Sequence, residues 1–118
     1  VFAIDVEGEV IGAIGIVLQK ENNRKNAEIG YWLAEPFWGK GIVTEAVQEM
    51  VQYAFKHFDI HRLYAGVFEY NPASMRVLEK AGFHLEAILH QSVYKEDKLW
   101  NEHIYVKFRE ETNNPDKV

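Results

Sequence analysis

A glycine-containing turn in the first half of the chain has the composition of an anion-binding site. Gly39 and Gly41 flank Lys40, and an amphipathic segment begins directly afterwards at Ile42. Glycine lets the backbone turn sharply and present several N–H groups to one side, and the start of a helix adds the positive end of its dipole. The spacing therefore predicts a phosphate-binding turn. The same spacing also occurs where glycines serve only the geometry of a turn.

Two common nucleotide-binding motifs are not completed at this turn. The dinucleotide-binding motif needs a third glycine and an acidic residue after the next strand, and the P-loop needs Gly-Lys-Ser/Thr. Here Lys40 lies between the two glycines, and neither pattern follows. The ordinary nucleotide-binding folds are therefore disfavoured.

The segments on either side of the turn predict the elements that hold it. Residues 27–34 alternate between apolar and polar positions, which predicts a strand, and Pro36 ends it because proline cannot donate to a sheet ladder. Hydrophobic residues recur at three- and four-residue spacing from Ile42 to Phe58, which predicts a long amphipathic helix. A further strand at residues 62–68 completes a crossover, so we expect the two strands to be parallel.

The rest of the chain predicts further strands and one short helix around this crossover. Asn71 and Pro72 suit the start of the helix, and Gly82 suits its end. We expect strands at residues 1–6, 10–18, 83–94 and 99–108, with polar loops at 19–26 and 95–98. The prediction is one α/β (α+β) domain over residues 1–108, with a mixed sheet flanked by helices, and a frayed charged tail over residues 109–118.

Composition excludes several kinds of site. The chain has 118 residues, 47% of them hydrophobic, a formal net charge of −5 and no cysteine. Without cysteine there is no disulfide framework and no thiol nucleophile, and the histidines show no paired spacing, so we expect no metal. The acidic charge argues against nucleic acid, and no apolar run reaches the length of a membrane span. We expect a cytoplasmic protein.

Two separated motifs resemble those of the GNAT superfamily of acetyl-CoA-dependent N-acetyltransferases. They are EIGYWLAEPFWGKGIVTEA at residues 28–46 and NPASMRVLEKAGF at residues 71–83. The likeness extends over residues 1–108 and is strongest to the branch of ribosomal-protein alanine and serine N-acetyltransferases. It implies a splayed mixed sheet and acetyl transfer to an amine. Relatives carry a further N-terminal strand and helices, so it also implies a domain that lacks them.

The resemblance also implies where acetyl-CoA would bind. The family holds the pyrophosphate on backbone N–H groups of the turn, which here would be those of Trp38, Gly39, Lys40, Gly41, Ile42 and Val43. The pantetheine arm would lie like an extra strand beside Trp32, Leu33 and Ala34, where backbone partners are available. Asn71 and Ser74 match family residues near the thioester.

The candidate catalytic residues are Ser74 and Asn71, which the resemblance implies, and Glu28, which its position in the chain suggests. The family's tyrosine acid is replaced by Leu78, and a usual Gln or Arg before the turn is replaced by Pro36. Ser74 is then the best remaining hydroxyl to donate a hydrogen bond to the leaving thiolate, unless it is only a polar residue in a first helical turn. Glu28 is the first candidate base because it lies on the strand leading to the acetyl site. The reserves are Glu69, Tyr70 and Tyr94, and a water route would need none of them.

The acceptor stays open at the level of sequence. We expect a primary amine, first the α-amino group of a protein N-terminus, and as an alternative a small molecule such as a polyamine or an aminoglycoside. The same fold could instead serve as a non-catalytic CoA-binding or interaction module. A phosphate or nucleotide binder unrelated to acetyl transfer is a further alternative. An incomplete domain would expose apolar surface, so a homodimer is possible.

Overall fold

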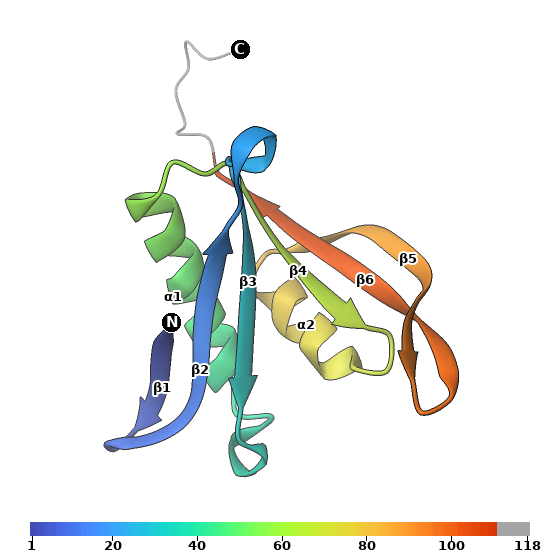
Figure 1. The fold of residues 1–118 in the computed structure, drawn as a ribbon. Coiled ribbons are helices and arrows are strands. Elements are labelled where there is room, and N and C mark those ends of the chain that lie inside the picture. The colour runs from blue at the N-terminus through green and yellow to red at the C-terminus, as the bar shows by residue number, and fades with distance from the viewer. Residues whose placement is uncertain (111–118) are drawn as a thin grey trace.

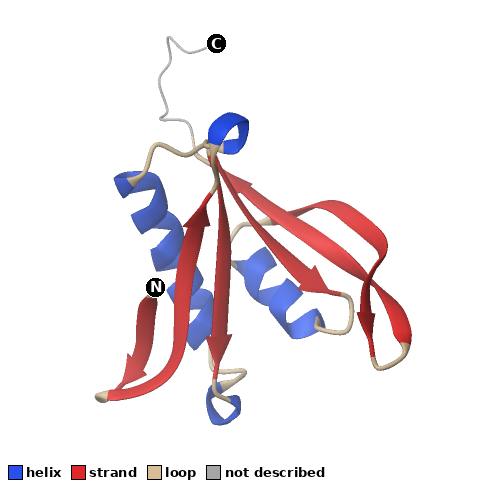
Figure 2. Cartoon of the chain, viewed as in Figure 1, coloured by secondary structure: helices blue, strands red, loops and turns tan. Residues whose placement is uncertain are grey.

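The computed structural model describes residues 1–110, which form one six-stranded sheet and two α-helices (Figures 1 and 2). Short 3-10 helices lie at Glu21–Asn23 and Glu35–Phe37. In chain order the main elements are β1 (Phe2–Val6), β2 (Glu9–Leu18), β3 (Asn26–Leu33), α1 (Ile42–His57), β4 (Arg62–Phe68), α2 (Pro72–Lys80), β5 (His84–Lys95) and β6 (Lys98–Phe108). The predicted mixed α+β fold is confirmed.

The sheet has the strand order β1-β2-β3-β4-β6-β5. Its one parallel pair is β3 with β4, and the other neighbours are antiparallel. The crossover through α1 therefore joins parallel strands, as the order of the elements predicts.

The parallel pairing is short. β3 and β4 are in register only from Asn26 opposite Arg62 to Glu28 opposite Tyr64. Beyond these residues the two strands diverge, and Figure 1 shows α2 in the opening between them. We call this opening between β3 and β4 the wedge. The expected splay of the sheet is confirmed.

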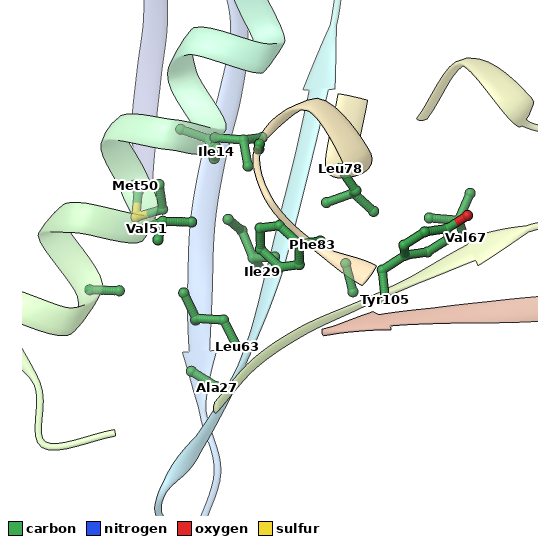
Figure 3. Close-up of a cluster of buried hydrophobic side chains, with 14 of the residues drawn as sticks. Ile14, Ala27, Ile29, Met50, Val51, Leu63, Val67, Leu78, Phe83 and Tyr105 are labelled. Atoms are coloured by element: carbon green, nitrogen blue, oxygen red, sulfur yellow. The ribbon is translucent and has the colours of Figure 1, made fainter. Parts of the chain in front are cut away.

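The hydrophobic core lies between the sheet and the two helices. Ala27 and Ile29 of β3 and Leu63 of β4 point into it, while Glu28 between them is exposed. Alternate residues of a strand face opposite sides, so β3 and β4 each present one apolar side to the helices. Figure 3 shows Leu78 of α2 in the same cluster.

Both ends of α2 carry the capping residues that the sequence predicts. The Asn71 side chain accepts a hydrogen bond from the backbone N–H of Ser74 at 3.3 Å. At the other end Gly82 has a φ of 94°, and the N–H of Phe83 donates to the carbonyl of Leu78. These are the side-chain N-cap and the left-handed C-terminal turn that stabilise a short helix.

The structure differs from the sequence prediction at two peripheral segments. A 3-10 helix at Glu21–Asn23 lies within the predicted loop. Arg109, predicted to begin the frayed tail, is instead anchored, because its guanidinium donates to the carbonyls of Ile60 and Phe58, each at 2.9 Å. The rest of that tail, from residue 111 onward, lies outside the described residues. Among residues 1–110 no helix is long and apolar enough to cross a membrane.

Replacing Leu63 by alanine should lower the free energy of unfolding by about 3 kcal/mol, because its side chain is fully buried beside the start of the wedge. Urea denaturation measures the change. Leu99→Ala is the matched control, because Leu99 is 57% exposed on β6 and should lose less than about 1 kcal/mol. Equal losses in the two variants would contradict this account of the core.

Candidate functional site

A cleft of about 430 Å³ opens at the wedge. Its walls come from the last residues of β3, the turn that precedes α1 with the first residues of that helix, and the face of α2 that carries Ser74 together with its N-cap Asn71. Most of the residues that the sequence analysis assigns to acetyl-CoA line this one cleft: Trp32, Leu33, Trp38, Gly39, Lys40, Gly41, Ile42, Val43, Asn71 and Ser74.

The glycine turn needs its glycines for backbone conformation. Gly39 and Gly41 have φ angles of 76° and 77°, in the left-handed region that costs other residues strain. A Cβ at either position would meet no atom within 4 Å, so the space beside the turn is open. Gly41 is also the N-cap of α1 and offers no side chain to the first N–H groups of the helix. These groups are left for a ligand at the positive end of the helix dipole.

Trp38 contributes less backbone to this turn than the sequence analysis expects. Its N–H donates to the carbonyl of Glu35 at 3.0 Å, within the short 3-10 helix. Its indole instead donates to the carbonyl of Leu33 at 2.6 Å, and the residue is 62% exposed. The N–H groups available to an anion are therefore those from Gly39 onward.

The edge of β3 that faces the wedge has free backbone groups. At the two ends of the β2–β3 ladder, the N–H of Ala34 donates to Ile11 and the N–H of Gln19 donates to Asn26. Hydrogen-bonded pairs alternate along an antiparallel ladder, so the backbone N–H and C=O groups of the even-numbered residues of β3 point toward β2. Beyond the parallel pairing, the backbone groups of the odd-numbered residues point toward the wedge; these residues are Ile29, Tyr31 and Leu33.

This alternation divides the stretch that the sequence analysis assigns to the pantetheine arm. Ala34 uses its N–H on β2 and does not line the cleft. Trp32 faces β2 with its backbone and contributes its exposed side chain. Of the three residues, Leu33 is the one whose backbone faces the wedge, and its N–H is the open group there because its carbonyl accepts from the Trp38 indole.

Ser74 lies opposite this edge, on the first turn of α2, and meets a residue that the sequence analysis did not assign to the site. Its Oγ lies 2.6 Å from the Oη of Tyr31. Burial raises the pKa of Tyr31 above its ordinary value of 10.0, and the hydrogen bond to Ser74 offsets part of that increase. The phenol therefore stays protonated through the neutral range. The sequence pattern placed Tyr31 only on the core side of β3.

Three cations line the cleft, and no carboxylate among residues 1–110 does so. They are Lys40 of the turn, and Arg76 and Lys80 of α2. The chain as a whole has a net charge of −5, so the cleft is a local reversal of its charge. The helical spacing of Ala73, Arg76 and Lys80 is the signal that could have identified the last two.

The candidate bases do not enter the cleft. Glu28 lies at the closed end of the wedge on the exposed side of the sheet, in register with Tyr64. The Glu69 carboxylate accepts a hydrogen bond from the backbone N–H of Asn101 at 2.7 Å, and Tyr94 donates to Asp97 at 2.9 Å. Tyr70 packs edge-to-face against Trp100. No group of His, Asp or Glu within residues 1–110 could hold a metal ion.

Comparison with known sequences gives a consistent family. Residues 1–84 match the model described as the acetyltransferase (GNAT) domain. The probable N-acetyltransferase YjcK of Bacillus subtilis is 43% identical over 82% of this chain and 53% of its own length. The ribosomal-protein-serine acetyltransferase of Escherichia coli is 33% identical over 90% of this chain and 59% of its own length. The chain thus spans little more than half the length of these relatives.

Solved structures agree with the sequences. The microcin C7 self-immunity acetyltransferase MccE, in complex with acetyl-CoA and AMP, matches with a TM-score of 0.74 at 29% identity, over 86% of this chain and 56% of that chain. The ribosomal-protein-S5-alanine acetyltransferase of Vibrio fischeri matches with a TM-score of 0.77 at 25% identity, over the same shares of the two chains.

The raised pKa of Tyr31 predicts a loss of stability in alkali. Above the ordinary tyrosine pKa of 10.0 the unfolded chain releases this proton while the folded chain retains it, so the free energy of unfolding falls as the pH rises. Tyr31→Phe should make the fall between about pH 9.5 and about pH 11 shallower in urea denaturation. Tyr94→Phe, which removes an exposed phenol, is the control. A slope that Tyr31→Phe leaves unchanged would contradict the burial of this hydroxyl.

Proposed function

Because the chain belongs to the GNAT acetyltransferase family, we propose that it transfers an acetyl group from acetyl-CoA to a primary amine. The observation that carries the proposal is the meeting of an uncapped helix start, an open strand edge and three cations in one cleft. Acetyl-CoA has a matching order of parts, with phosphates at one end, an amide-containing arm in the middle and a thioester at the other end.

The residues of the cleft suit these parts in turn. The N–H groups from Gly39 to Val43 would bind the pyrophosphate, and the cations that line the same cleft, Lys40, Arg76 and Lys80, would attract phosphate charge. The backbone of Leu33 and Tyr31 would pair with the amides of the arm, as a strand edge pairs with a peptide. A strand N–H that faces the wedge could then polarise the thioester carbonyl.

For the acceptor we propose the α-amino group of a protein N-terminus. Relatives named for acetylation of ribosomal-protein serine and alanine support this choice. An α-amino group has a pKa of about 8, whereas a lysine side chain has a pKa of about 10.4. A larger fraction of the α-amino group is therefore neutral and nucleophilic near neutral pH. Such an acceptor depends less on a strong base, which suits a cleft without a carboxylate in its lining. We keep Glu28 as the first candidate base, with its side chain on the exposed side of the sheet and outside the cleft lining.

Gly41→Glu should abolish binding of acetyl-CoA in isothermal titration, because it puts bulk and negative charge beside the anion-binding turn. Gly8→Glu is the matched control: Gly8 has a φ of 86°, a Cβ there also meets no atom within 4 Å, and it lies in the β1–β2 turn. The two variants share charge and backbone strain, so only the position differs. Binding that survives in Gly41→Glu would refute the proposed cofactor site. A folded wild-type chain that binds no acetyl-CoA would refute it as well.

Arg76→Ala and Lys80→Ala should each weaken binding of acetyl-CoA by about threefold, and salt should reduce the difference from the wild-type chain. Lys56→Ala, on an exposed position near the end of α1, should bind as the wild-type chain does. Titration at low and high ionic strength measures the effect. A loss that salt does not change would show that the cations act through folding instead.

Acceptor choice is tested by acetyl transfer to short peptides that begin with alanine or serine, with spermidine as the small-amine comparison. The proposal predicts a larger kcat/KM for the peptides. Preference for spermidine would overturn the protein acceptor but leave acetyl transfer standing, and binding of acetyl-CoA without transfer to any amine would favour a non-catalytic module.

A further inference from the structure

The contact between Tyr31 and Ser74 joins the two walls of the wedge. Their hydroxyl oxygens are 2.6 Å apart, at the short end of the range for hydrogen bonds between hydroxyls. The backbone carbonyl of Ser74 also lies 3.4 Å from the Tyr31 oxygen, which is too long to compete for the phenolic proton. The interaction of Tyr31 with α2 is therefore mainly with the Ser74 side chain.

Each hydroxyl of this pair is held from its own side. Tyr31 stands on β3 opposite Ile14 of β2, and its side chain packs against the core. Ser74 sits in the first turn of α2, where its N–H is bonded to the Asn71 side chain. Both residues line the cleft. The geometry of the pair is thus set by a strand and a capped helix, which are rigid supports for a functional group.

We propose that Tyr31 is a positioning residue, which donates its hydroxyl proton to Ser74 Oγ and so directs the Ser74 proton into the cleft. A serine hydroxyl has one proton and two lone pairs, so accepting from Tyr31 leaves its own proton free for another partner. The inference rests on the proposed function, because that partner would be the sulfur of acetyl-CoA. The raised pKa of Tyr31 supports this direction, since a phenol that stays protonated remains a donor.

The role of the pair in acetyl transfer can be stated with its atoms balanced. The amine nitrogen forms a bond to the acetyl carbon and the carbon–sulfur bond breaks, which leaves a thiolate. The amine loses one proton to solvent or base, and the thiolate gains one. Ser74 would donate a hydrogen bond to the sulfur as its negative charge develops, and Tyr31 would strengthen that bond by donating to Ser74.

Because α2 has Leu78 where the resemblance implies a tyrosine, we assign the hydrogen bond to the sulfur to Ser74. Leu78 occupies the helix position at which the resemblance implies a tyrosine acid, and its side chain is fully buried in the core. Ser74 is the hydroxyl that α2 contributes to the cleft lining. Tyr31 thus supplies a phenol to this region from β3 instead of from the helix.

The test compares Tyr31→Phe, Ser74→Ala and the double variant in acetyl transfer to the peptides above. We expect each single variant to lower kcat about tenfold with little change in KM for acetyl-CoA. The double variant should be no slower than Ser74→Ala, because Tyr31 acts through Ser74. Tyr105→Phe is the matched control, since it removes a phenol from a buried residue of β6 outside the cleft lining.

A second readout does not depend on turnover. A Ser74 hydroxyl directed at the sulfur should lower the pKa of the thiol of bound CoA, which thiolate absorbance measures as the pH is raised. Tyr31→Phe and Ser74→Ala should both diminish that shift, and Tyr105→Phe should not. Circular dichroism establishes that each variant is folded.

The outcomes separate this inference from the proposed function. Suppose that the wild-type chain transfers acetyl, or binds CoA with a lowered thiol pKa. If Tyr31→Phe then changes neither kcat nor the thiol pKa, the positioning role is overturned and the proposed function is left intact. Additive losses in the double variant also overturn it, because they would mean that Tyr31 acts independently of Ser74. A folded wild-type chain that binds no CoA overturns the proposed function and this inference together.

Discussion

The short parallel ladder between β3 and β4 is the constraint on which the rest of the site depends. Three residues of each strand are in register, and the strands then separate. This leaves the backbone of Tyr31 and Leu33 without a strand partner on that side, and it makes room for α2 to bring Ser74 up to β3. A longer ladder would close the wedge and remove both features. The site therefore depends on backbone hydrogen-bonding groups that the sheet leaves without a strand partner.

Charge and helix dipole both act on the cleft. The first turn of α1 has no side-chain cap, and the turn before it holds two residues in the left-handed region. Such a helix start is stabilised when an anion satisfies its N–H groups. Lys40, Arg76 and Lys80 line the same cleft, although acidic residues outnumber basic ones in the chain. Local placement therefore matters more for an anionic ligand than the sign of the net charge.

Features of the site that are local in sequence were predictable, and those made by folding were not. The φ angles of Gly39 and Gly41 and the capping by Asn71 follow from residue types and their neighbours. Tyr31 and Ser74 are 43 residues apart, and alternation alone could only place Tyr31 on the apolar side of its strand. Arg109 looked like the start of a charged tail because its partners, the carbonyls of Phe58 and Ile60, are about fifty residues away. Every residue has a backbone carbonyl, so the composition does not indicate which carbonyls will accept a hydrogen bond from Arg109.

The free edge of β3 has a consequence for association between chains. An unpaired strand edge is in general a template on which another polypeptide can add a strand, and proteins protect such edges. Here the edge lies inside the sheet, with α2 on one side of it and β4 converging on it at one end. The Trp38 indole also occupies the carbonyl of Leu33. An incoming strand carries side chains on both its faces, and those on the helix side would have to fit among Tyr31, Ser74 and Val77, which line the cleft, whereas a narrower chain has less bulk to place there. The wedge thus keeps hydrogen-bonding groups available to a small molecule while denying them to aggregation.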